Sequence, residues 1–421
     1  MRNSDYFKGK KVTVVGLARS GLACANLLYD LGSEVWVSEI NDSPVTRQSA
    51  ARLKVPYIKL ELGRHTREFI EGKDLVVVSP GVANTSLPVV WAQESGIPVL
   101  SEIEIGWMLC PAKIIAVTGS SGKTTVTTLI ARVLATAGKK AFALGNIGSP
   151  FCQEVAEISP GDFVSLEVSS FQLERIRGFK PDIAVMLNIN RNHLDRHKDM
   201  QEYIDAKKHI FMNQDGGDFL VINKEDEVLV EIAREVKSRV EYFFPQPPWN
   251  PNQAAVIKVA QLLNIKEDVC RKVFKDFKGL PHRLEFVAEI GQVRFINDSK
   301  ATLVESAIWA ISNISSPIVL IAGGKDKGVD YSGILPAAKG RVKEVILIGQ
   351  AKDKIRDALF GKLPLSEASN LKQAVEMAYN KASSGDCVLL SPMCSSFDMF
   401  SSYEERGDEF KRMVMDLARA K

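Results

Sequence analysis

The chain has 421 residues, of which 45% are hydrophobic and 25% are charged, as in an ordinary globular protein. This length exceeds what one compact core holds, so it predicts two to four domains. The 54 basic and 51 acidic side chains leave a formal charge of +3. So small an excess argues against a nucleic-acid-binding protein, which usually carries a basic face, but it allows a small anionic substrate.

The cysteines and the first residues indicate a cytoplasmic protein. The chain has 6 cysteines without a CxxC pair or a zinc-like spacing, which predicts reduced, buried thiols. Its polar start, MRNSDYFKGKK, runs directly into a predicted strand and does not resemble a signal peptide. No apolar run approaches the roughly 20 residues that span a bilayer, so we expect no membrane segment.

Residues 11–104 follow the βαβ rhythm of a Rossmann-like unit. In chain order the predicted elements are a strand at 11–15, a helix at 22–31 and strands at 34–37 and 75–78. The turn at 16–21 has Ala18 where the pattern GxGxxG has its middle glycine, so it is a weak signal for a dinucleotide. The turn either simply joins a strand to a helix or holds a small nucleotide group at the helix N-terminus.

Two further α/β blocks follow, so we predict three α/β domains at 1–104, 105–280 and 281–421. In the second block the predicted elements are strands at 113–118, 163–167, 183–187 and 219–222 and helices at 123–137 and 252–263. In the third block they are strands at 317–322, 344–348 and 387–391 and a helix at 371–382. A linker is predicted at 279–281, and the lack of a repeat argues against a solenoid.

The strand at 114–118 leads directly into the loop 119–125, with the sequence GSSGKTT. Small residues let the backbone N–H groups of the loop turn inward, and the following helix directs its positive end at the loop. Lys123 can then reach the β- and γ-phosphates of a nucleoside triphosphate, and the Thr124 hydroxyl can bind Mg²⁺. Val117 stands where a full Walker A motif has glycine, so this is a shortened variant. The alternative is a chance glycine-rich turn.

Other polar residues follow nearby strands, but a phosphate loop alone does not separate a kinase, a motor ATPase and a ligase. Glu167 ends the strand at 163–167, where a carboxylate could hold a metal ion near the phosphates. His193, in the polar stretch 188–197, is a candidate metal ligand or substrate contact, although a lone histidine is more often a structural hydrogen-bonding group. On pattern alone, Lys207 is one more lysine on a helix surface.

A series of motifs in a fixed order gives a more specific interpretation. They are GSSGKTT (119–125), GNIG (145–148), LEVSSFQLE (166–174), HLDRH (193–197), GLPHR (279–283), NDSKAT (297–302), SPMCSSFDMF (391–400) and YEERG (403–407). Together they span nearly the whole chain, and the sequence resembles the MurD-type branch of the Mur ligases. HLDRH, DSKAT and SPMCSSFD are specific to that branch.

The resemblance implies a Rossmann-like N-terminal domain for a uridine nucleotide, a central P-loop ATPase domain and a C-terminal Rossmann-like domain that binds the amino acid. It also implies a reaction in cytoplasmic peptidoglycan precursor synthesis. ATP would phosphorylate the carboxylate of UDP-N-acetylmuramoyl-L-alanine, and the amine of D-glutamate would displace the phosphate. Two Mg²⁺ ions would neutralise the oxygens on which charge accumulates. The implied enzyme is a monomer that works on small molecules, without nucleic-acid or membrane partners.

The resemblance also assigns site residues, four of which are catalytic: Lys123, Glu167, His193 and Lys207. The implied metal ligands are Thr124 and Glu167 on one Mg²⁺, His193 on a second, and Lys207 as a carbamate. The implied ATP contacts are Gly119, Ser120, Ser121, Gly122, Lys123, Thr124, Thr125, Asn252, Arg283 and Asp298. Those to the UDP substrate are Leu17, Ala18, Arg19, Ser20, Glu39, Ser79, Gly81, Asn146 and Ser169. Those to D-glutamate are Lys300, Thr302, Lys327, Ser396, Phe397 and Tyr403.

The chain also departs from the family pattern. The departures are Ser121 in place of asparagine, Asn192 in place of aspartate, Leu303 in place of asparagine, Pro248-Trp249 in place of a His-Asn pair, and a shortened stretch at 223–252. They affect the expected adenine contacts and the edge of the central domain, and they leave the four catalytic residues unchanged.

Three alternatives remain. Another Mur-type or folylpolyglutamate-like ligase is disfavoured by DSKAT and SPMCSSFD, because the amino-acid pocket is where the branches differ. A catalytically silent relative could retain nucleotide binding. A P-loop kinase or transport ATPase does not explain the two flanking α/β domains.

Overall fold

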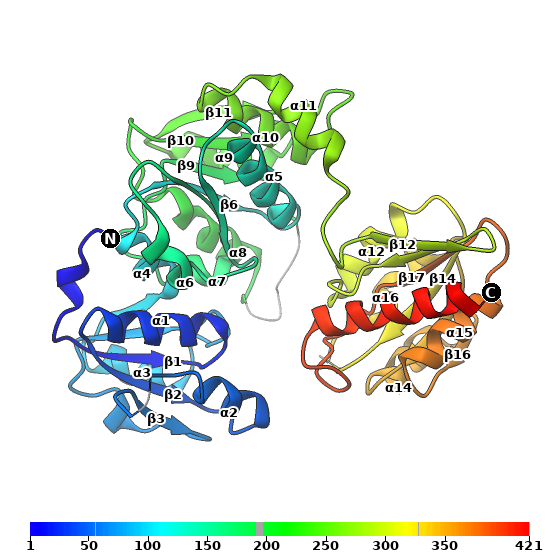
Figure 1. The fold of residues 1–421 in the computed structure, drawn as a ribbon, viewed down its shortest axis with the longest axis horizontal. Helices are drawn as coiled ribbons and strands as arrows, with labels where there is room; N and C mark the ends of the chain where they lie inside the picture. Colours follow the sequence, from blue (N-terminus) through cyan, green and yellow to red (C-terminus); the bar gives the residue numbers. More distant parts are fainter. Residues whose placement is uncertain (55, 191–196, 327, 421) are drawn as a thin grey trace. The chain divides into compact units, whose positions relative to one another are not determined.

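The computed structural model describes residues 1–54, 56–190, 197–326 and 328–420 (Figure 1). The chain divides into two compact units, Met1–Phe277 and Lys278–Lys421. The first unit holds two β-sheets and the second unit holds one. Within the described ranges, no helix is both long and apolar enough to cross a membrane.

The first sheet has five parallel strands in the order β3-β2-β1-β4-β5. Its strands are β1 (Lys11–Val15), β2 (Glu34–Glu39), β3 (Lys59–Leu62), β4 (Leu75–Val78) and β5 (Val99–Ser101). Its helical segments are η1 (Ser4–Phe7), α1 (Arg19–Asp30), α2 (Pro44–Ala50), η2 (Arg67–Phe69), α3 (Leu87–Glu94) and α4 (Glu102–Leu109). All four residues of the valine-rich β4 are buried, as expected for a parallel strand covered on both faces.

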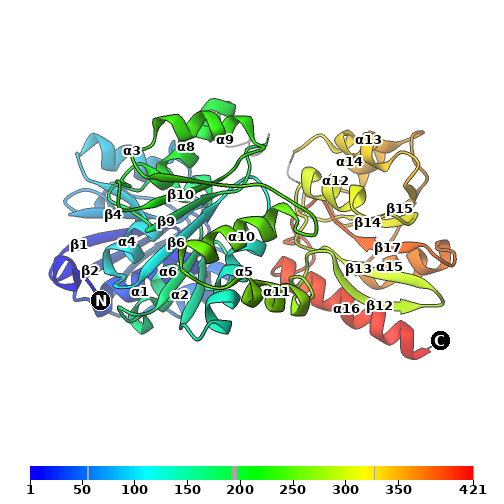
Figure 2. The same cartoon turned by 90° about the horizontal axis from the view of Figure 1, so that it is seen from above.

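The second sheet has six parallel strands in the order β11-β10-β9-β6-β8-β7. They are β6 (Lys113–Thr118), β7 (Ala141–Gly145), β8 (Phe163–Glu167), β9 (Ile183–Met186), β10 (Phe219–Asn223) and β11 (Arg239–Phe243). The helical segments are α5 (Lys123–Thr136), α6 (Phe151–Glu154), η3 (Val155–Glu157), α7 (Ser170–Leu173), α8 (Met200–Lys208), η4 (His209–Phe211), α9 (Glu227–Ile232), η5 (Ala233–Glu235), α10 (Pro251–Leu262) and α11 (Glu267–Asp276). Helices α5, α10 and α11 pack together beside this sheet (Figure 2).

The third sheet forms the second unit, with six strands in the order β12-β13-β17-β14-β15-β16. They are β12 (Glu285–Ile290), β13 (Val293–Asn297), β14 (Ile318–Gly323), β15 (Val342–Ile348), β16 (Leu365–Glu367) and β17 (Cys387–Leu390). The helical segments are α12 (Val304–Ser312), η6 (Tyr331–Ile334), α13 (Leu335–Ala338), α14 (Lys352–Leu359), α15 (Leu371–Lys381) and α16 (Tyr403–Ala420). Strands β12 and β13 pair antiparallel, and the other neighbours pair parallel.

The two sheets of the first unit are joined by a shared core. One hydrophobic cluster includes Val14 of β1 and Leu166 of β8. In α4, which connects the sheets, the carboxylate of Glu104 accepts hydrogen bonds from the backbone N–H groups of residues 177–179, at 3.0, 2.7 and 3.0 Å. The Trp107 indole donates to a carbonyl of the same segment, that of Lys180, at 3.1 Å. The loops that follow β1 and β6 therefore belong to one packed body.

The expected α/β alternation is confirmed, and several strand bounds agree to the residue. The strands at 11–15, 75–78, 113–118 and 163–167 match β1, β4, β6 and β8. Helix α1 begins at Arg19, three residues earlier than predicted at Leu22, so the predicted turn is shorter. The β12–β13 hairpin was not predicted, and β11 lies in the stretch that the sequence showed to be shortened. The 6 cysteines are unpaired and buried, as expected.

Candidate active site

The phosphate loop joins β6 to α5 at the carboxyl edge of the second sheet. Gly119 and Gly122 have φ angles of 151° and 81°, which L-residues with side chains rarely adopt, and Gly122 is the N-cap of α5. The Lys123 ammonium donates to the carbonyl oxygens of Gly119 at 2.9 Å and of Ser120 at 3.3 Å. Lys123 therefore lies over the loop, which is where the sequence predicts it.

Asn188, two residues after β9, supports the loop from the side of the neighbouring strand. Its side-chain oxygen accepts from the backbone N–H of Ser121 at 2.9 Å and from the Ser121 hydroxyl at 3.3 Å. Its carbonyl accepts from the N–H of Ser120 at 3.0 Å. Asn188 lies in the polar stretch 188–197, for which the sequence alone did not predict this role. Its position at the end of a strand beside β6 is the signal that could have found it.

Glu167 ends β8 and lies beside the loop, because β8 pairs with β6 and Glu167 is in register with Val117. Its side chain is buried, and Oε1 accepts from the Asn146 amide at 3.1 Å. Its other oxygen, Oε2, is buried and has no hydrogen-bond partner among the described residues. A buried carboxylate oxygen without a partner is costly unless a cation binds it. With the buried Thr124 at the start of α5, this donor set fits Mg²⁺.

Lys207 is 1% exposed, which corrects the prediction from pattern alone of a helix-surface lysine. Its ammonium donates to Thr118 Oγ1 at 3.2 Å and to the Gly119 carbonyl at 3.0 Å, and it lies 4.7 Å from the centre of the Tyr203 ring. Burial lowers the pKa of Lys207 well below its usual range; the charge of Lys123 lowers it further, and Glu167 opposes the shift. Lys207 thus joins Lys123 and Glu167 at the phosphate loop.

His193 lies outside the described residues. The other histidine of the HLDRH motif, His197, is 2% exposed. Its Nε2 lies 3.0 Å from the Ser170 hydroxyl, and its ring stacks on Phe171 at 5.2 Å between centroids. His197 also places its ring edge-on to Tyr203 at 5.4 Å, and the Tyr203 hydroxyl lies 2.9 Å from Ser120 Oγ. This part of the motif therefore supports the loop through its neighbours.

Asn252, predicted to contact ATP, lies beside the phosphate loop, and Ser169, predicted to contact the UDP substrate, lies at the start of α7. A Cβ on Gly122 would lie 2.4 Å from Asn252 Oδ1, so Asn252 lies directly against the phosphate loop. Ser169 caps α7, since its hydroxyl accepts from the Gln172 N–H at 3.3 Å and donates to Gln172 Oε1 at 2.9 Å. Trp249, in the unusual Pro248-Trp249 pair, packs edge-on against Phe274.

In the first sheet, the expected uridine residues surround the turn from β1 to α1. Glu39 Oε2 accepts from the backbone N–H of Leu17 at 2.7 Å, which ties the end of β2 to the turn. The Ser79 hydroxyl donates to the Gly16 carbonyl at 3.0 Å. A Cβ on Gly21 would lie 1.9 Å from that carbonyl oxygen, so only glycine allows α1 to approach the turn this closely. Ala18, Arg19 and Ser20 lie at the N-terminus of α1.

In the second unit, Asp298 follows β13 and is buried. Its Oδ2 accepts from the Ser391 hydroxyl at 2.9 Å, and Oδ1 accepts from the Leu284 N–H at 3.3 Å. Burial raises the pKa of Asp298 to about 7, against the lowering effect of the Ser391 hydrogen bond and the nearby Arg283 charge. The structure therefore brings Arg283 and Asp298 into one neighbourhood.

The expected amino-acid residues gather near the start of α16. The Lys300 ammonium lies 5.4 Å from the centre of the Tyr403 ring, and the Thr302 N–H donates to the Lys300 carbonyl at 2.9 Å. Ser396 is buried, whereas the Phe397 side chain is 65% exposed. Lys327 lies outside the described residues.

Arg406, which sequence reasoning did not assign, connects three of the motifs. It is fully buried and donates to Ser299 Oγ at 2.9 Å, to the Ser299 carbonyl at 2.8 Å and to the Cys394 carbonyl at 3.1 Å. The sequence did contain a signal for this role, because Arg406 is a charged residue within the motif YEERG.

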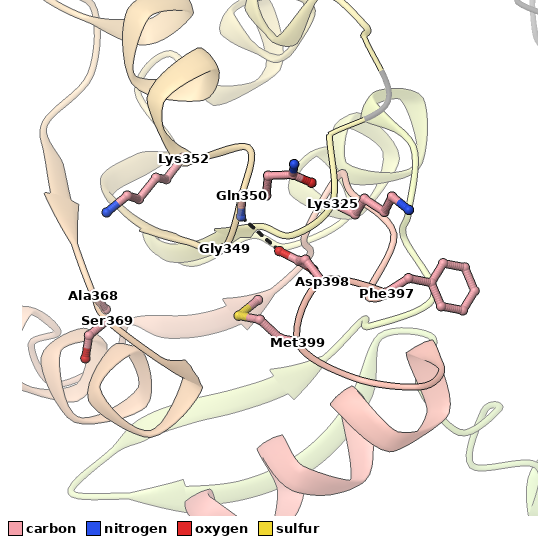
Figure 3. A pocket seen from close by; sticks show the side chains of 9 residues that line it. All are labelled: Lys325, Gly349, Gln350, Lys352, Ala368, Ser369, Phe397, Asp398 and Met399. Carbon is pink, nitrogen blue, oxygen red and sulfur yellow. Dashed lines mark hydrogen bonds between the residues drawn. The ribbon is translucent and has the colours of Figure 1, made fainter. Parts of the chain in front are cut away.

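A cavity of about 630 Å³ opens at the carboxyl ends of β14, β15 and β17. Figure 3 shows Asp398 directed at the turn after β15, where it accepts from the Gln350 N–H at 2.9 Å. The residues that line the cavity are Lys325, Gly349, Gln350, Lys352, Ala368, Ser369, Phe397, Asp398 and Met399. Of the five predicted D-glutamate contacts that lie in the described part of the chain, only Phe397 lines the cavity, so the cavity and these predicted contacts do not coincide.

The fold and this site define an α/β enzyme class with a phosphate-binding loop and two flanking Rossmann-like domains. Residues 10–101 match the Mur ligase MurD-like N-terminal domain, 117–258 the Mur ligase middle domain, and 282–394 the Mur ligase glutamate ligase domain. The chain belongs to the Mur ligase family.

Relatives and solved structures agree with this assignment. The chain is 40% identical to the UDP-N-acetylmuramoylalanine–D-glutamate ligase of Thermoanaerobacter pseudethanolicus, over 98% of this chain and 99% of that one. It is 39% identical to the enzyme of the same name from Salinibacter ruber, with the same coverage. The UDP-N-acetylmuramate-alanine ligase of Thermotoga maritima shares the fold, with a TM-score of 0.60, 18% identity, and coverage of 98% of this chain and 100% of that one.

Proposed function

We propose that this chain is an ATP-dependent ligase that adds D-glutamate to UDP-N-acetylmuramoyl-L-alanine, giving ADP and phosphate, in peptidoglycan precursor synthesis. The observation that carries the proposal is the convergence of Lys123, Glu167 and Lys207 on one phosphate loop, in a chain 40% identical over nearly its full length to a ligase of that name. A carboxylate is a poor electrophile, and phosphorylation supplies the leaving group that an amine can displace.

Lys123 and the loop serve the transferred phosphate. The positive N-terminus of α5 and the backbone N–H groups of the loop face the position that the phosphates of ATP would take. Lys123 already lies over the loop and needs only to exchange carbonyl acceptors for phosphate oxygens. We assign the loop residues Gly119 to Thr125 to ATP, together with Asn252, Arg283 and Asp298.

Thr124 and Glu167 would hold one Mg²⁺, since Glu167 Oε2 is buried without a partner in the described part of the chain. Bound there, Mg²⁺ supplies charge neutralisation for the phosphate oxygens. His193 is assigned to a second Mg²⁺ on resemblance alone. The protein itself keeps the phosphate loop in place, because Asn188 and Tyr203 hydrogen-bond to Ser121 and Ser120, respectively.

Lys207 is proposed to carry a carbamate. Burial and the Lys123 charge favour its neutral amine, and a neutral amine nitrogen can attack CO₂. The new N–C bond forms as the amine gives up a proton, which turns a would-be cation into an anionic oxygen donor suited to Mg²⁺. Lys207→Ala is therefore expected to lose activity and to recover part of it with acetate. No rescue at any acetate concentration would contradict the carbamate.

The remaining assignments place the acceptor on the first unit and the amino acid on the second. The acceptor contacts are proposed to be Leu17, Ala18, Arg19, Ser20, Glu39, Ser79, Gly81, Asn146 and Ser169. The D-glutamate contacts are proposed to be Lys300, Thr302, Lys327, Ser396, Phe397 and Tyr403. We propose domain limits at 1–104, 105–280 and 281–421, and a monomer in the cytoplasm.

The test is phosphate release from ATP with Mg²⁺ and UDP-N-acetylmuramoyl-L-alanine, with and without D-glutamate. The proposal expects release that depends on both substrates and is lost in Lys123→Ala. Release that ignores D-glutamate, or that is faster with another amino acid, would overturn it.

A further inference from the structure

The loop after β4 is tied to the central domain through one side chain, Asn84. The Asn84 amide donates to Glu174 Oε2 at 2.6 Å, and Arg175 Nε donates to Asn84 Oδ1 at 2.8 Å. Both ends of the amide are therefore held by two consecutive residues of the central domain. This same loop begins with Ser79 and Gly81, which we assign to the acceptor.

Arg175 is held by a second segment of the first sheet. Its carbonyl accepts from the N–H of Ser101, the last residue of β5, at 2.8 Å. The loop after β4 and the last residue of the neighbouring strand β5 thus both bond Arg175, which follows α7. The contact is a joint between the two sheets.

The contact between Asn84 and Glu174 is connected through α7 to Glu167, the carboxylate that we propose to bind Mg²⁺. Glu174 is the C-cap of α7 and follows Glu167, the last residue of β8, after only one helical turn. Ser169 and Gln172 close a capping box at the start of that turn, which fixes its entry angle. A short rigid segment therefore connects the Asn84 contact with Glu167.

His197 holds the same turn from the side of the phosphate loop. Its Nδ1 lies 3.5 Å from Glu174 Oε1, and its Nε2 lies 3.0 Å from Ser170 Oγ. Through Tyr203, whose hydroxyl contacts Ser120, this packing reaches the phosphate loop itself. Helix α7 is thus held between the loop after β4, which begins with Ser79, and the phosphate loop at 119–125.

We propose that Asn84 is a positioning residue, which fixes the acceptor loop to the α7 turn and so sets the acceptor carboxylate against Glu167 and the phosphate loop. This inference rests on the proposed function. A long substrate held at its nucleotide end reacts at its far end, so a small shift at the joint moves the reacting carboxylate. A misplacement of about 1 Å reduces a rate by about 100-fold.

The central test is a double-mutant cycle with Asn84→Ala and Glu174→Ala, followed by steady-state kinetics. Asn84→Ala is expected to lower kcat by about 10-fold, because the joint loosens without losing a reacting group. The KM for ATP and the Kd for UDP are expected to change less than about 2-fold, because neither ligand needs both halves of the joint. The double variant should be less impaired than the product of the two single effects, because both changes remove the same Asn84–Glu174 hydrogen bond, while Asn84 also contacts Arg175 and Glu174 also contacts His197.

Two controls separate positioning from folding. Asn26→Ala removes two comparable hydrogen bonds inside the first domain, one to the Arg52 carbonyl and one from the Lys54 N–H, and should leave kcat unchanged. Glu174→Gln retains an acceptor for the Asn84 amide and should restore most of the activity that Glu174→Ala loses.

Three results would overturn the inference: an unchanged kcat in Asn84→Ala, a Kd for UDP that rises as much as kcat falls, or multiplicative effects in the cycle. If Asn84→Ala folds poorly, the Glu174→Ala and Glu174→Gln pair carries the same comparison. A wild-type protein without D-glutamate-dependent phosphate release would instead refute the proposed function, so the two failures are distinguishable.

Discussion

Lys207 and Arg406 are both buried basic residues, with 1% and 0% of their surfaces exposed, but they are held in different ways. Lys207 makes two long hydrogen bonds, at 3.0 and 3.2 Å, and has a cation, Lys123, nearby. Arg406 makes three hydrogen bonds between 2.8 and 3.1 Å to Ser299 and Cys394. Burial lowers the pKa of Arg406 only to about 10, so its charge persists at neutral pH.

This difference shows that a buried basic side chain can serve either catalysis or the stability of the fold. The guanidinium spreads its charge over a planar fork that matches several acceptors, so a buried arginine remains charged and rigid. The lysine ammonium loses its proton more readily on burial, which exposes a nucleophilic amine. We therefore assign Lys207 to chemistry and Arg406 to holding the second unit together.

The largest expected effect is that of Lys207→Arg on the rate. A guanidinium keeps its charge and forms no carbamate, so kcat should fall by about 1,000-fold. The far-ultraviolet circular dichroism spectrum and the melting temperature should stay close to wild type. Activity within 10-fold of wild type would remove the distinction between the two buried basic residues.

The reciprocal exchange, Arg406→Lys, should act on stability. An ammonium cannot span the acceptors on Ser299 and Cys394, and it leaves buried carbonyl oxygens unpaired. We expect the free energy of unfolding of the second unit to fall by about 3 kcal/mol, measured by urea denaturation. An unchanged denaturation midpoint would show that the fork geometry is not needed.

The buried carboxyl of Glu102 allows the same comparison for an acidic side chain. Glu102, at the start of α4, is 1% exposed, and burial raises its pKa to about 7, against the lowering effect of hydrogen bonds from Cys152. In the unfolded chain the carboxyl ionises near its ordinary pKa of 4.5, so between these values the folded protein binds the extra proton. The free energy of unfolding should therefore fall by about 2 kcal/mol as the pH rises from 5 to 7. Glu102→Gln should flatten this slope, and an equal slope in both proteins would contradict the assignment.

The smallest effect is expected from Ser299→Ala. This change removes the hydroxyl that accepts from Arg406 and donates to the Tyr403 carbonyl at 2.8 Å, and it leaves the other two acceptors of Arg406, both carbonyl oxygens, in place. The free energy of unfolding should fall by about 1.5 kcal/mol, since two hydrogen bonds are lost and each contributes a net value of about 0.5–1.5 kcal/mol. A loss as large as that of Arg406→Lys would mean that the hydroxyl, rather than the fork, holds the side chain.

The sequence predicted best where local chemistry alone decides the structure. The strand at 113–118, the glycine loop and α5 follow from a buried apolar run, two glycines with positive φ and a helical spacing of apolar residues. Glu167 was found in the same way, because the end of a strand beside the loop is a position that the pattern itself defines.

Other features depend on contacts between distant segments, which one sequence does not reveal. Lys207 looked exposed because its helix pattern is polar, yet α8 packs it under the loop. Asn188, Arg406 and Asn84 act through partners that lie, respectively, 67, 107 and 90 residues away. The β12–β13 hairpin was missed for a local reason, since its alternating residues are only partly buried and give no strong apolar run.

The most direct test of the central claim is to identify the product by mass spectrometry. Purified protein would be given ATP, Mg²⁺, UDP-N-acetylmuramoyl-L-alanine and either D- or L-glutamate. The account predicts that the nucleotide gains one glutamyl residue with D-glutamate only, with one ADP and one phosphate formed per product. Equal gain with L-glutamate, addition of a different amino acid, or ADP without a heavier nucleotide product would contradict it.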